Sequence, residues 1–363
     1  MPVRASVTGA ERIKFITPKG RSLAFTRLGF GAAPIGNMHR VLTDAEAEAV
    51  AFAAWDVQLR YFDTAPLYGH GLSETRLGRV LGEKPRAEFL LSTKVGRLLR
   101  PCPAGEEGGG IYKGVPPLSC RYDYSYDGVM RSFEESIARL GLAHVDILYV
   151  HDIDARNHGG QDACETRLRE LIDQGGWRAL DELRASGQVT AIGAGVNEWE
   201  PCARLLELAD PDLFLLAGRY TLLEQTPLEA FFPACSRRGI GIVNGGPFNS
   251  GILARGPEGD GCYDYGRVPP EVVRRVEALA SICRRFETSL VAAALQFAAA
   301  HPVVVSVIPG AQTIGELTAN VQAFDQPIAS GLWDALREAR LLHPEAPTPD
   351  EPRGARDLAQ AGY

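Results

Sequence analysis

Four side chains that can move or orient a proton lie at the ends of short apolar runs in this sequence. Asp63 ends one run, and Tyr68 follows it by five residues. Lys94 ends the next run along the chain, and His151 directly follows a third. A cation beside a tyrosine stabilises the phenolate, which lowers the pKa of the phenol from about 10. We therefore expect acid–base chemistry in which Tyr68 exchanges the proton, Asp63 and Lys94 tune it, and His151 holds a substrate oxygen.

Each of these residues also has a purely structural interpretation. A single histidine after a strand is more often structural than catalytic, and Tyr68 can be a packed aromatic. Asp63 and Lys94 can form an ion pair with no role in chemistry. The feature that favours chemistry is the occurrence of all four at the ends of consecutive apolar runs.

The elements that must position these residues alternate along the chain. Apolar runs predict eight strands, at 28–31, 61–64, 89–94, 145–150, 191–196, 213–216, 240–243 and 303–308. Helical spacing and capping residues predict helices that begin near 43 and 73 and span 127–140, 168–185, 200–209, 228–237, 271–300 (in one or two pieces) and 314–323.

Eight strands, each followed by a helix, predict an α/β fold in which a parallel sheet closes as a (β/α)8 TIM barrel. In such a barrel the carboxyl ends of the strands form the active-site face. The alternative is a doubly wound open sheet. The absence of a G-x-G-x-x-G opening a helix after the first strand counts against it.

The remaining residues predict additions to the barrel. Residues 13–26 predict an N-terminal hairpin and 332–341 a C-terminal helix. The Gly- and Pro-rich segment 98–126 follows a strand end, and we expect it to be a long loop that selects the substrate; the alternative is a mobile surface insertion. We expect one domain over 1–344 and a flexible polar tail over 345–363.

Composition argues against several classes of protein. Among the 363 residues, 38 Lys and Arg against 45 Asp and Glu give a formal charge of −7. The acidic balance argues against a nucleic-acid partner, and no polybasic run favours an anionic lipid surface. No apolar run reaches the ~18 residues of a membrane helix, and the first residues lack an apolar signal core.

The cysteines and histidines predict neither a disulfide framework nor a metal site. Seven cysteines without a C-x-x-C pair favour free thiols in a reducing compartment, so we expect a cytoplasmic protein. His144, His151 and His158 fall on a predicted helix end, strand end and loop, which argues against a zinc site. We expect a small-molecule substrate and a monomer or small homo-oligomer.

The segments that carry the four residues resemble those of the aldo-keto reductases. Residues 61–69 (YFDTAPLYG) are similar to the family's aspartate and tyrosine segment, 92–95 (STKV) to its lysine segment, and 145–151 (VDILYVH) to its histidine segment. The resemblance extends from about residue 28 to residue 323. It implies an Asp-Tyr-Lys-His tetrad, a nicotinamide cofactor bound without a separate Rossmann domain, and direct hydride transfer to or from a carbonyl carbon.

Within that family the sequence is most similar to the branch of D-threo-aldose (L-fucose) and L-galactose 1-dehydrogenases. The segments concerned are 124–129, 139–142, 151–153 and 217–225. The resemblance implies oxidation of a cyclic aldose at its anomeric carbon to a lactone. Pyridoxal dehydrogenases share the branch, so a pyridoxal or small-aldehyde oxidoreductase with the same tetrad is an alternative. An alternative of another class is a redox-sensing, nicotinamide-binding module.

The resemblance also implies a set of cofactor-binding positions. They are Gly31, Asp63, Asn197, Gly246, Pro247, Phe248, Ser250, Ile308, Gly310, Gln312, Glu316 and Asn320. Asn197 matches an asparagine that binds the carboxamide, and 246–251 match a loop over the pyrophosphate, where backbone N–H groups hold phosphate oxygens. This chain departs from the usual serine, glutamine and aromatic residue with Val196, Ala217 and Gly245.

The adenosine end of the predicted cofactor site lacks a cation. Family members that prefer NADP usually place a lysine or arginine there, but this chain has Gly310, Gln312 and Glu316. Because Glu316 would repel a 2′-phosphate, we expect NAD to be preferred, with NADP as the alternative cofactor. In another interpretation these residues only cap a helix, and Arg219 or another cation reaches the phosphate.

Overall fold

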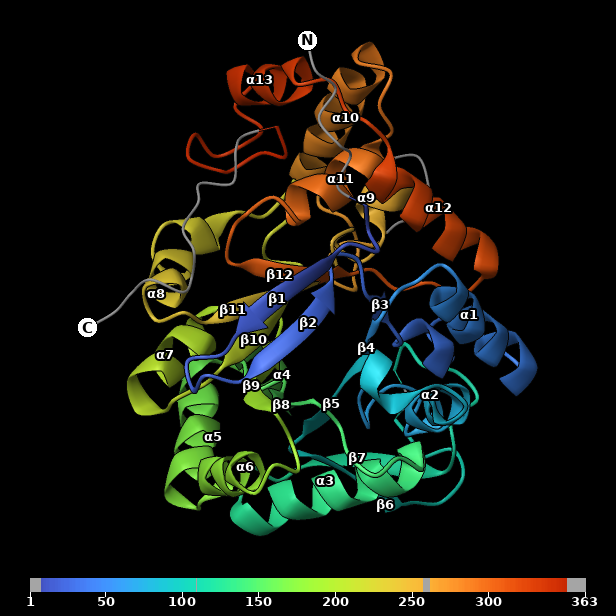
Figure 1. The fold of residues 1–363 in the computed structure, drawn as a ribbon, viewed down its shortest axis with the longest axis vertical. Helices are drawn as coiled ribbons and strands as arrows, with labels where there is room; N and C mark the ends of the chain where they lie inside the picture. Colours follow the sequence, from blue (N-terminus) through green and yellow to red (C-terminus); the bar gives the residue numbers. More distant parts are fainter. Residues whose placement is uncertain (1–7, 109, 257–261, 351–363) are drawn as a thin grey trace.

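Eight parallel strands form the centre of the computed structural model, which describes residues 8–108, 110–256 and 262–350 (Figure 1). They are β3 (Phe30–Gly31), β4 (Tyr61–Asp63), β5 (Leu90–Val95), β8 (Ile147–His151), β9 (Ala191–Val196), β10 (Leu213–Ala217), β11 (Gly241–Gly245) and β12 (Val304–Ile308). Their spatial order is the order along the chain. Gly29 N donates to Val307 O (2.8 Å) and Val307 N to Arg27 O (2.9 Å), which joins the first strand to the last. The predicted (β/α)8 barrel is confirmed.

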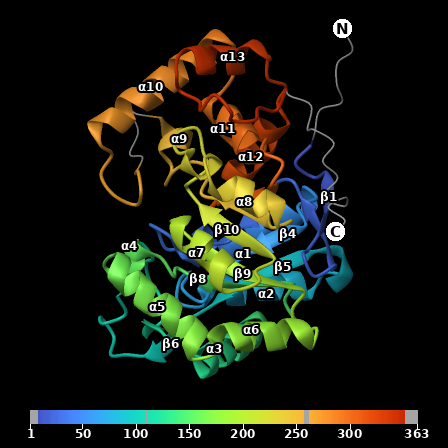
Figure 2. The same ribbon diagram turned by 90° about the vertical axis from the view of Figure 1, so that its left-hand side faces the viewer.

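Helices surround these strands in the view of Figure 1, and the turned view shows helices both above and below the strands (Figure 2). The helices between strands are α1 (Asp44–Asp56), α2 (Leu72–Gly82), α3 (Tyr126–Leu140), α4 (Ala155–His158), α5 (Gln161–Asp173), α6 (Gly176–Ala185), α7 (Glu200–Leu208), α8 (Phe231–Arg237), α9 (Ile252–Arg255), α10 (Pro270–Arg285) and α11 (Leu290–Ala298). After the last strand come α12 (Ile314–Asp325) and α13 (Gly331–Glu338). A capping box of Thr43 and Glu46 begins α1.

The helix predicted over 168–185 is two helices, so this expectation is wrong. The chain breaks between α5 and α6 at Gly175, whose φ of +82° is a left-handed conformation that glycine adopts without strain. A Cβ atom at Gly176 would overlap the carbonyl oxygen of Tyr124. The break therefore lets the start of α6 approach the segment that enters α3.

The N-terminal hairpin closes one end of the barrel. β1 (Arg12–Ile16) and β2 (Ser22–Thr26) are antiparallel. Phe15 and Phe25 are buried in one cluster with residues at the strand starts, and the Phe25 ring packs edge-on against Tyr61 with centroids 4.8 Å apart. The hairpin thus supplies apolar side chains to the amino-terminal end of the barrel, which leaves the opposite end for a site.

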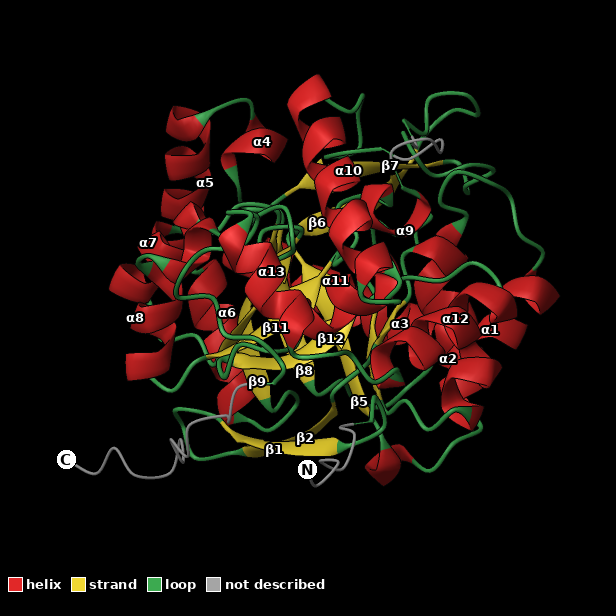
Figure 3. Cartoon of the chain, turned by 90° about the horizontal axis from the view of Figure 1, so that it is seen from above, coloured by secondary structure: helices red, strands yellow, loops and turns green. Residues whose placement is uncertain are grey.

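A second hairpin lies at that opposite end, in the segment expected to be a loop (Figure 3). Within 98–126, β6 (Arg97–Pro101) and β7 (Leu118–Tyr122) form an antiparallel pair, and α3 begins at Tyr126. The loop expectation is therefore wrong for both flanks of the segment. Leu98 and Leu99 are buried, so packing stabilises strands that the Gly- and Pro-rich connection obscures in the sequence.

The described part of the C-terminal region packs on the barrel. Arg337 Nη2 donates to the carbonyl of Ala346 (3.0 Å), and Ala346 and Thr348 are buried. Residues 351–363 of the predicted flexible tail lie outside the described residues. The domain boundaries, the cytoplasmic location and the oligomeric state stay predictions.

Within the described ranges, no helix is long and apolar enough to span a bilayer. Those ranges also contain no group of three His, Cys, Asp or Glu side chains arranged to hold a metal ion. The seven cysteines are free thiols.

We predict that His301 makes the fold sensitive to acid. Burial lowers the pKa of this imidazole to about 4, and its Nδ1 accepts a hydrogen bond from Val303 N (3.1 Å), which requires the neutral ring. Because the unfolded chain binds this proton more tightly, stability is full above pH 6.5 and falls between pH 6.5 and pH 4. The contribution lost by pH 5 is about 1–2 kcal/mol.

Urea unfolding of the wild type and of His301→Asn at pH 7 and pH 5 tests this prediction. Asparagine can keep an acceptor for Val303 N but does not titrate, so the variant should lose less stability on acidification. An equal loss in both proteins would contradict the assignment.

Candidate active site

Three neighbouring strands bring the predicted acid–base residues to one end of the barrel. Asp63 ends β4, Lys94 lies next to the end of β5, and His151 ends β8. Tyr68 comes from the loop between β4 and α2. This loop packs tightly, since a Cβ at Gly69 would overlap the carbonyl oxygen of Gly36. The structure therefore brings all four predicted residues together.

Lys94 links Asp63 to Tyr68 in the interior of the barrel. Its Nζ lies 2.7 Å from Asp63 Oδ2, 2.9 Å from the carbonyl of Thr64 and 3.1 Å from the Tyr68 hydroxyl. Ser92 Oγ donates to the other oxygen of Asp63 (2.6 Å). Because an ammonium group only donates, Lys94 donates to the phenolic oxygen. The phenolic hydrogen of Tyr68 is then available to a substrate oxygen.

The Tyr68 phenol is less acidic than the sequence suggested. Burial raises the pKa of Tyr68 well above its ordinary value, and the negative charge of Asp63 raises it further. The expectation that this pKa lies below its ordinary value is therefore wrong, because burial and the Asp63 charge outweigh the hydrogen bond from Lys94 to the phenolic oxygen. Tyr68 is a neutral phenol, ready to donate a proton.

His151 is a neutral imidazole beside Tyr68. Burial lowers the pKa of His151 well below its ordinary value, and the cations Arg97 and Lys94 lower it further. The two rings meet edge to face with centroids 5.8 Å apart. His151 Nε2 lies 3.4 Å from Asp152 Oδ2 and no hydrogen bond joins the two, so a hydrogen on Nε2 is available to a substrate oxygen. His151 can therefore donate a hydrogen bond without carrying charge.

The loop after β11 has a backbone suited to binding an anion. Asn249, Ser250 and Gly251 have φ values of +46°, +60° and +102°. Asn249 Nδ2 donates to Gly218 O (3.0 Å), which ties the loop to the neighbouring strand end. Among the described residues, the N–H groups of Phe248 and Ser250 have no acceptor. Such N–H groups in a left-handed turn fit phosphate oxygens, and Gly246 and Pro247 lead into the turn.

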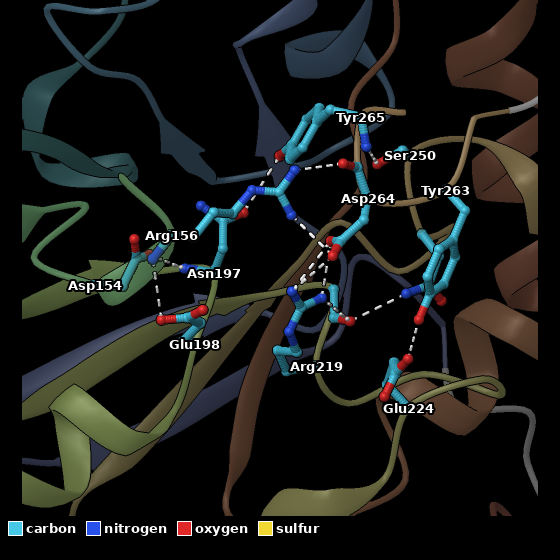
Figure 4. Close-up of polar contacts among 12 residues, drawn as sticks. Asp154, Arg156, Asn197, Glu198, Arg219, Glu224, Ser250, Tyr263, Asp264 and Tyr265 are labelled. Carbon is cyan, nitrogen blue, oxygen red and sulfur yellow. Dashed lines mark hydrogen bonds and ion pairs between the residues drawn. The ribbon is translucent and has the colours of Figure 1, made fainter. Parts of the chain in front are cut away.

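Asn197 lies just beyond the end of β9, at the mouth of the barrel (Figure 4). Its backbone N donates to Asp154 Oδ2 (2.9 Å), and its Nδ2 donates to Asp152 Oδ1 (3.3 Å). Its Oδ1 accepts from the Tyr265 hydroxyl (3.5 Å). These contacts fix the orientation of the side-chain amide, whose N–H and C=O groups are of the kind that can hydrogen-bond to the carboxamide of a nicotinamide ring.

The glycines predicted at the adenosine end have packing roles in this fold. Gly31 and Gly310 form a parallel β-bridge where the barrel closes. Gly310 lies two residues beyond Ile308, the last residue of β12. A Cβ at Gly31 would lie 2.9 Å from the carbonyl oxygen of Ile308, and one at Gly310 would lie 2.5 Å from Pro34 Cγ. Because packing alone requires glycine at position 310, the absence of a cationic side chain there does not by itself distinguish NAD from NADP.

The polar residues predicted at the adenosine end cap α12 in this fold. Glu316 Oε2 accepts from Gln312 N (2.7 Å), and Thr313 Oγ1 accepts from Glu316 N (3.0 Å). Asn320 Nδ2 donates to Gly310 O (3.5 Å). Sequence reasoning missed one exposed cation here, Arg40, whose Nη2 donates to Gln312 O (3.4 Å).

A polar bridge across the mouth was also missed (Figure 4). Asp264 pairs with Arg219 (3.1 Å) from beyond β10 and with Arg156 (2.8 Å) on α4. Tyr265 N donates to Ser250 Oγ (3.0 Å). The pairing of Arg219 with Asp264 counts against its reaching a phosphate at the adenosine end. Nothing in the sequence signals these contacts, because the partners are 45 and 108 positions apart.

The barrel thus places the four predicted acid–base residues together at the carboxyl ends of its strands. The model of the "Aldo/keto reductase family" matches residues 27–340, and the chain belongs to this family. Members of this family use nicotinamide cofactors. The backbone N–H groups at 248 and 250 and the Asn197 amide are donors and acceptors of the kind that such a cofactor needs.

Two relatives are similar over nearly their full length. The chain is 43% identical over 332 residues to D-threo-aldose 1-dehydrogenase of Pseudomonas sp. (90% of this chain, 96% of the relative). It is 42% identical over 333 residues to pyridoxal 4-dehydrogenase of Microbacterium luteolum (88% and 95%). The holo form of an aldo-keto reductase from Bacillus halodurans has a TM-score of 0.69 at 24% identity (92% and 97%), which supports the fold alone.

We predict that the Lys94–Asp63 pair is strongly coupled in stability. Lys94→Met leaves the Asp63 carboxylate buried without its cation, and such losses cost about 3–5 kcal/mol. The double variant Asp63→Asn/Lys94→Met removes both charges and should regain part of that loss. The measurement is chemical unfolding of both single variants, the double variant and the wild type.

The exposed pair Lys19–Asp210 offers a matched control. Lys19→Met should change the free energy of unfolding little, since exposed ion pairs contribute little. Additive losses in the buried pair would contradict the predicted coupling.

Proposed function

We propose that this protein oxidises a cyclic aldose at its anomeric carbon to a lactone, with a nicotinamide dinucleotide as hydride acceptor and NAD preferred. The observation that carries the proposal is the position of Lys94 Nζ, 2.7 Å from Asp63 and 3.1 Å from Tyr68, with the His151 ring alongside. The name of the relative from Pseudomonas sp. supports the substrate class.

In the proposed reaction the chain moves one proton. A nicotinamide dinucleotide held at the positions described above would supply the hydride acceptor. The anomeric C–H bond breaks with its electron pair, the hydroxyl proton passes to Tyr68 as phenolate, and the carbon–oxygen double bond of the lactone forms. Lys94 stabilises the phenolate through its hydrogen bond, and Asp63 holds Lys94 in place. His151 Nε2 donates to the reacting oxygen and orients it.

The direction of the reaction affects its dependence on pH. Because the pKa of Tyr68 is raised, the phenolate needed for oxidation is scarce at neutral pH and grows as the pH rises. In the reverse direction, the neutral phenol donates its proton to a carbonyl oxygen. We therefore infer that oxidation accelerates towards alkaline pH.

A second candidate is oxidation of pyridoxal or reduction of a small aldehyde by the same four residues. The name of the relative from Microbacterium luteolum supports it. The chemistry at Tyr68 and His151 is the same, so these residues do not separate the two candidates.

A substrate panel separates them. Purified protein is mixed with NAD or NADP and L-fucose, D-arabinose, L-galactose or pyridoxal, and NADH or NADPH formation is followed by absorbance. Turnover of a sugar supports the first candidate, and turnover of pyridoxal alone supports the second. Tight cofactor binding without turnover of any compound would overturn both and favour a nicotinamide-sensing module.

We predict that Tyr68→Phe lowers kcat by at least ~10²-fold, because it removes the proton-transfer group and keeps the ring. Cofactor affinity, measured by quenching of protein fluorescence, should be unchanged. Tyr149→Phe is the control, since it removes a buried phenol that bonds to Tyr61 (3.3 Å) inside the barrel. Near wild-type turnover in Tyr68→Phe would refute the assigned role.

We predict that Glu316→Arg moves cofactor preference from NAD towards NADP. Reversing one charge near a phosphate changes the interaction by about 1–3 kcal/mol, or roughly 10- to 100-fold in kcat/KM. The gain should shrink as salt rises. Gly310→Lys is not a useful partner substitution, because its Cβ would lie 2.5 Å from Pro34 Cγ.

The control for this prediction is Glu316→Gln, which retains an acceptor for Gln312 N and loses the charge. It should show part of the shift. A wild-type protein that already prefers NADP would contradict the prediction and would implicate another cation such as Arg40.

A further inference from the structure

A second buried ion pair lies beside the proposed tetrad. Arg97 Nη2, at the start of β6, lies 2.5 Å from Asp152 Oδ2, and both side chains are about nine-tenths buried. The Arg97 guanidinium stacks over the ring of Tyr122, 4.4 Å from its centroid. Asp152 directly follows His151, so the pair joins the hairpin of β6 and β7 to the end of β8.

The backbone holds Asp152 in an unfavourable conformation. Its φ of +50° is left-handed, a region that residues with a Cβ rarely adopt, although aspartate enters it more readily than most. Its N–H donates to Gly195 O (2.9 Å), and the hydroxyl of Tyr124 donates to the preceding carbonyl, of His151 (2.8 Å). Such conformations persist where surrounding contacts enforce them, and they concentrate at functional sites.

The partners of Asp152 distinguish it from the structural aspartates of this barrel. The carboxylates of Asp146 and Asp212 each accept a backbone N–H in addition to an arginine. Asp154 accepts two backbone N–H groups. Among the described residues, the carboxylate of Asp152 meets only side chains, those of Arg97, His151 and Asn197. The Asp152 carboxylate therefore links side chains of the site to one another and does not bind backbone N–H groups, as the other three carboxylates do.

The Asp152 carboxylate has acceptor capacity to spare. Oδ1 receives only the long hydrogen bond from Asn197 Nδ2 (3.3 Å), although each carboxylate oxygen can accept two. Burial raises the pKa of Tyr68 and of Tyr112, and the charge of Asp152 contributes to both shifts, so the carboxylate lies close to both phenols. Because Arg97 balances its charge, the pair suits a neutral hydroxyl donor better than a cation.

We propose that Asp152, held by Arg97, is a specificity-determining residue that accepts a hydrogen bond from the hydroxyl on the carbon next to the reacting carbon. The proposal rests on the proposed oxidoreductase function. Oδ2 adjoins His151 Nε2, which orients the reacting oxygen, so an oxygen on the neighbouring carbon is within reach of the same carboxylate. The site then selects α-hydroxy substrates, such as aldoses, over compounds that lack this group.

The test compares substrates that differ only in this hydroxyl. D-Arabinose and 2-deoxy-D-ribose are compared in oxidation, and lactaldehyde and propanal in reduction. The wild type should favour the hydroxylated member of each pair about 10- to 100-fold in kcat/KM. Asp152→Ala should lower kcat/KM for the hydroxylated member by a similar factor and for its partner by less than threefold.

Asp152→Asn, which preserves shape, should give an intermediate effect and guards against misfolding of the alanine variant. Asp212→Asn is the matched control, because it neutralises a buried carboxylate paired with Arg184 (2.7 Å) away from the site. It should lower stability and leave both substrate ratios unchanged.

The outcomes separate this proposal from the proposed function. If the wild type oxidises no aldose but its preference for lactaldehyde over propanal depends on Asp152, the aldose function fails and this proposal stands. A wild-type ratio near one in the pair that turns over would overturn the proposal. So would an equal loss for both members of a pair in Asp152→Ala, which would show that Asp152 only orients His151.

Discussion

The arrangement of the site follows from one constraint: the ammonium group of Lys94 is buried inside the barrel, and burying a charge is unfavourable unless it is compensated. Lys94 is 1% exposed, and a charge removed from water in this way persists only with a close counter-ion and satisfied hydrogens. Asp63, the carbonyl of Thr64 and the Tyr68 hydroxyl meet these needs. The need to satisfy Lys94 thereby sets the ends of β4 and β5 and the path of the following loop.

Other charged side chains at the mouth of the barrel are also paired with opposite charges. Arg97 pairs with Asp152, and Arg156 and Arg219 share Asp264, so each of these arginines lies beside a carboxylate. Burial keeps the pKa of His151 low and that of Tyr68 high, so both stay neutral among these pairs. A neutral donor and a neutral acid can then meet an uncharged substrate oxygen without a change in net charge.

The features that could be predicted from the sequence are those set by the order of residues within a short stretch of chain. Asp63, Lys94 and His151 follow apolar runs, and the barrel rule places such residues at one end. The break at Gly175 and the flanks of the 98–126 hairpin were missed, because they depend on packing against Tyr124 and on the burial of Leu98 and Leu99. The raised pKa of Tyr68 follows from its burial and from the nearby Asp63 charge, which only the folded structure shows. The Asp264 bridge joins residues too distant in sequence for any pattern to connect.

Closure of the barrel also has a consequence for biosynthesis. The hydrogen bonds of Gly29 and Val307 join strands from opposite ends of the chain. A ribosome that adds 5–20 residues per second needs roughly 14–56 s to make the intervening stretch of about 280 residues. Throughout that interval β3 has no partner on one side, and its open edge can pair with other chains. This edge of the nascent chain therefore stays unpaired until the last strand leaves the ribosome.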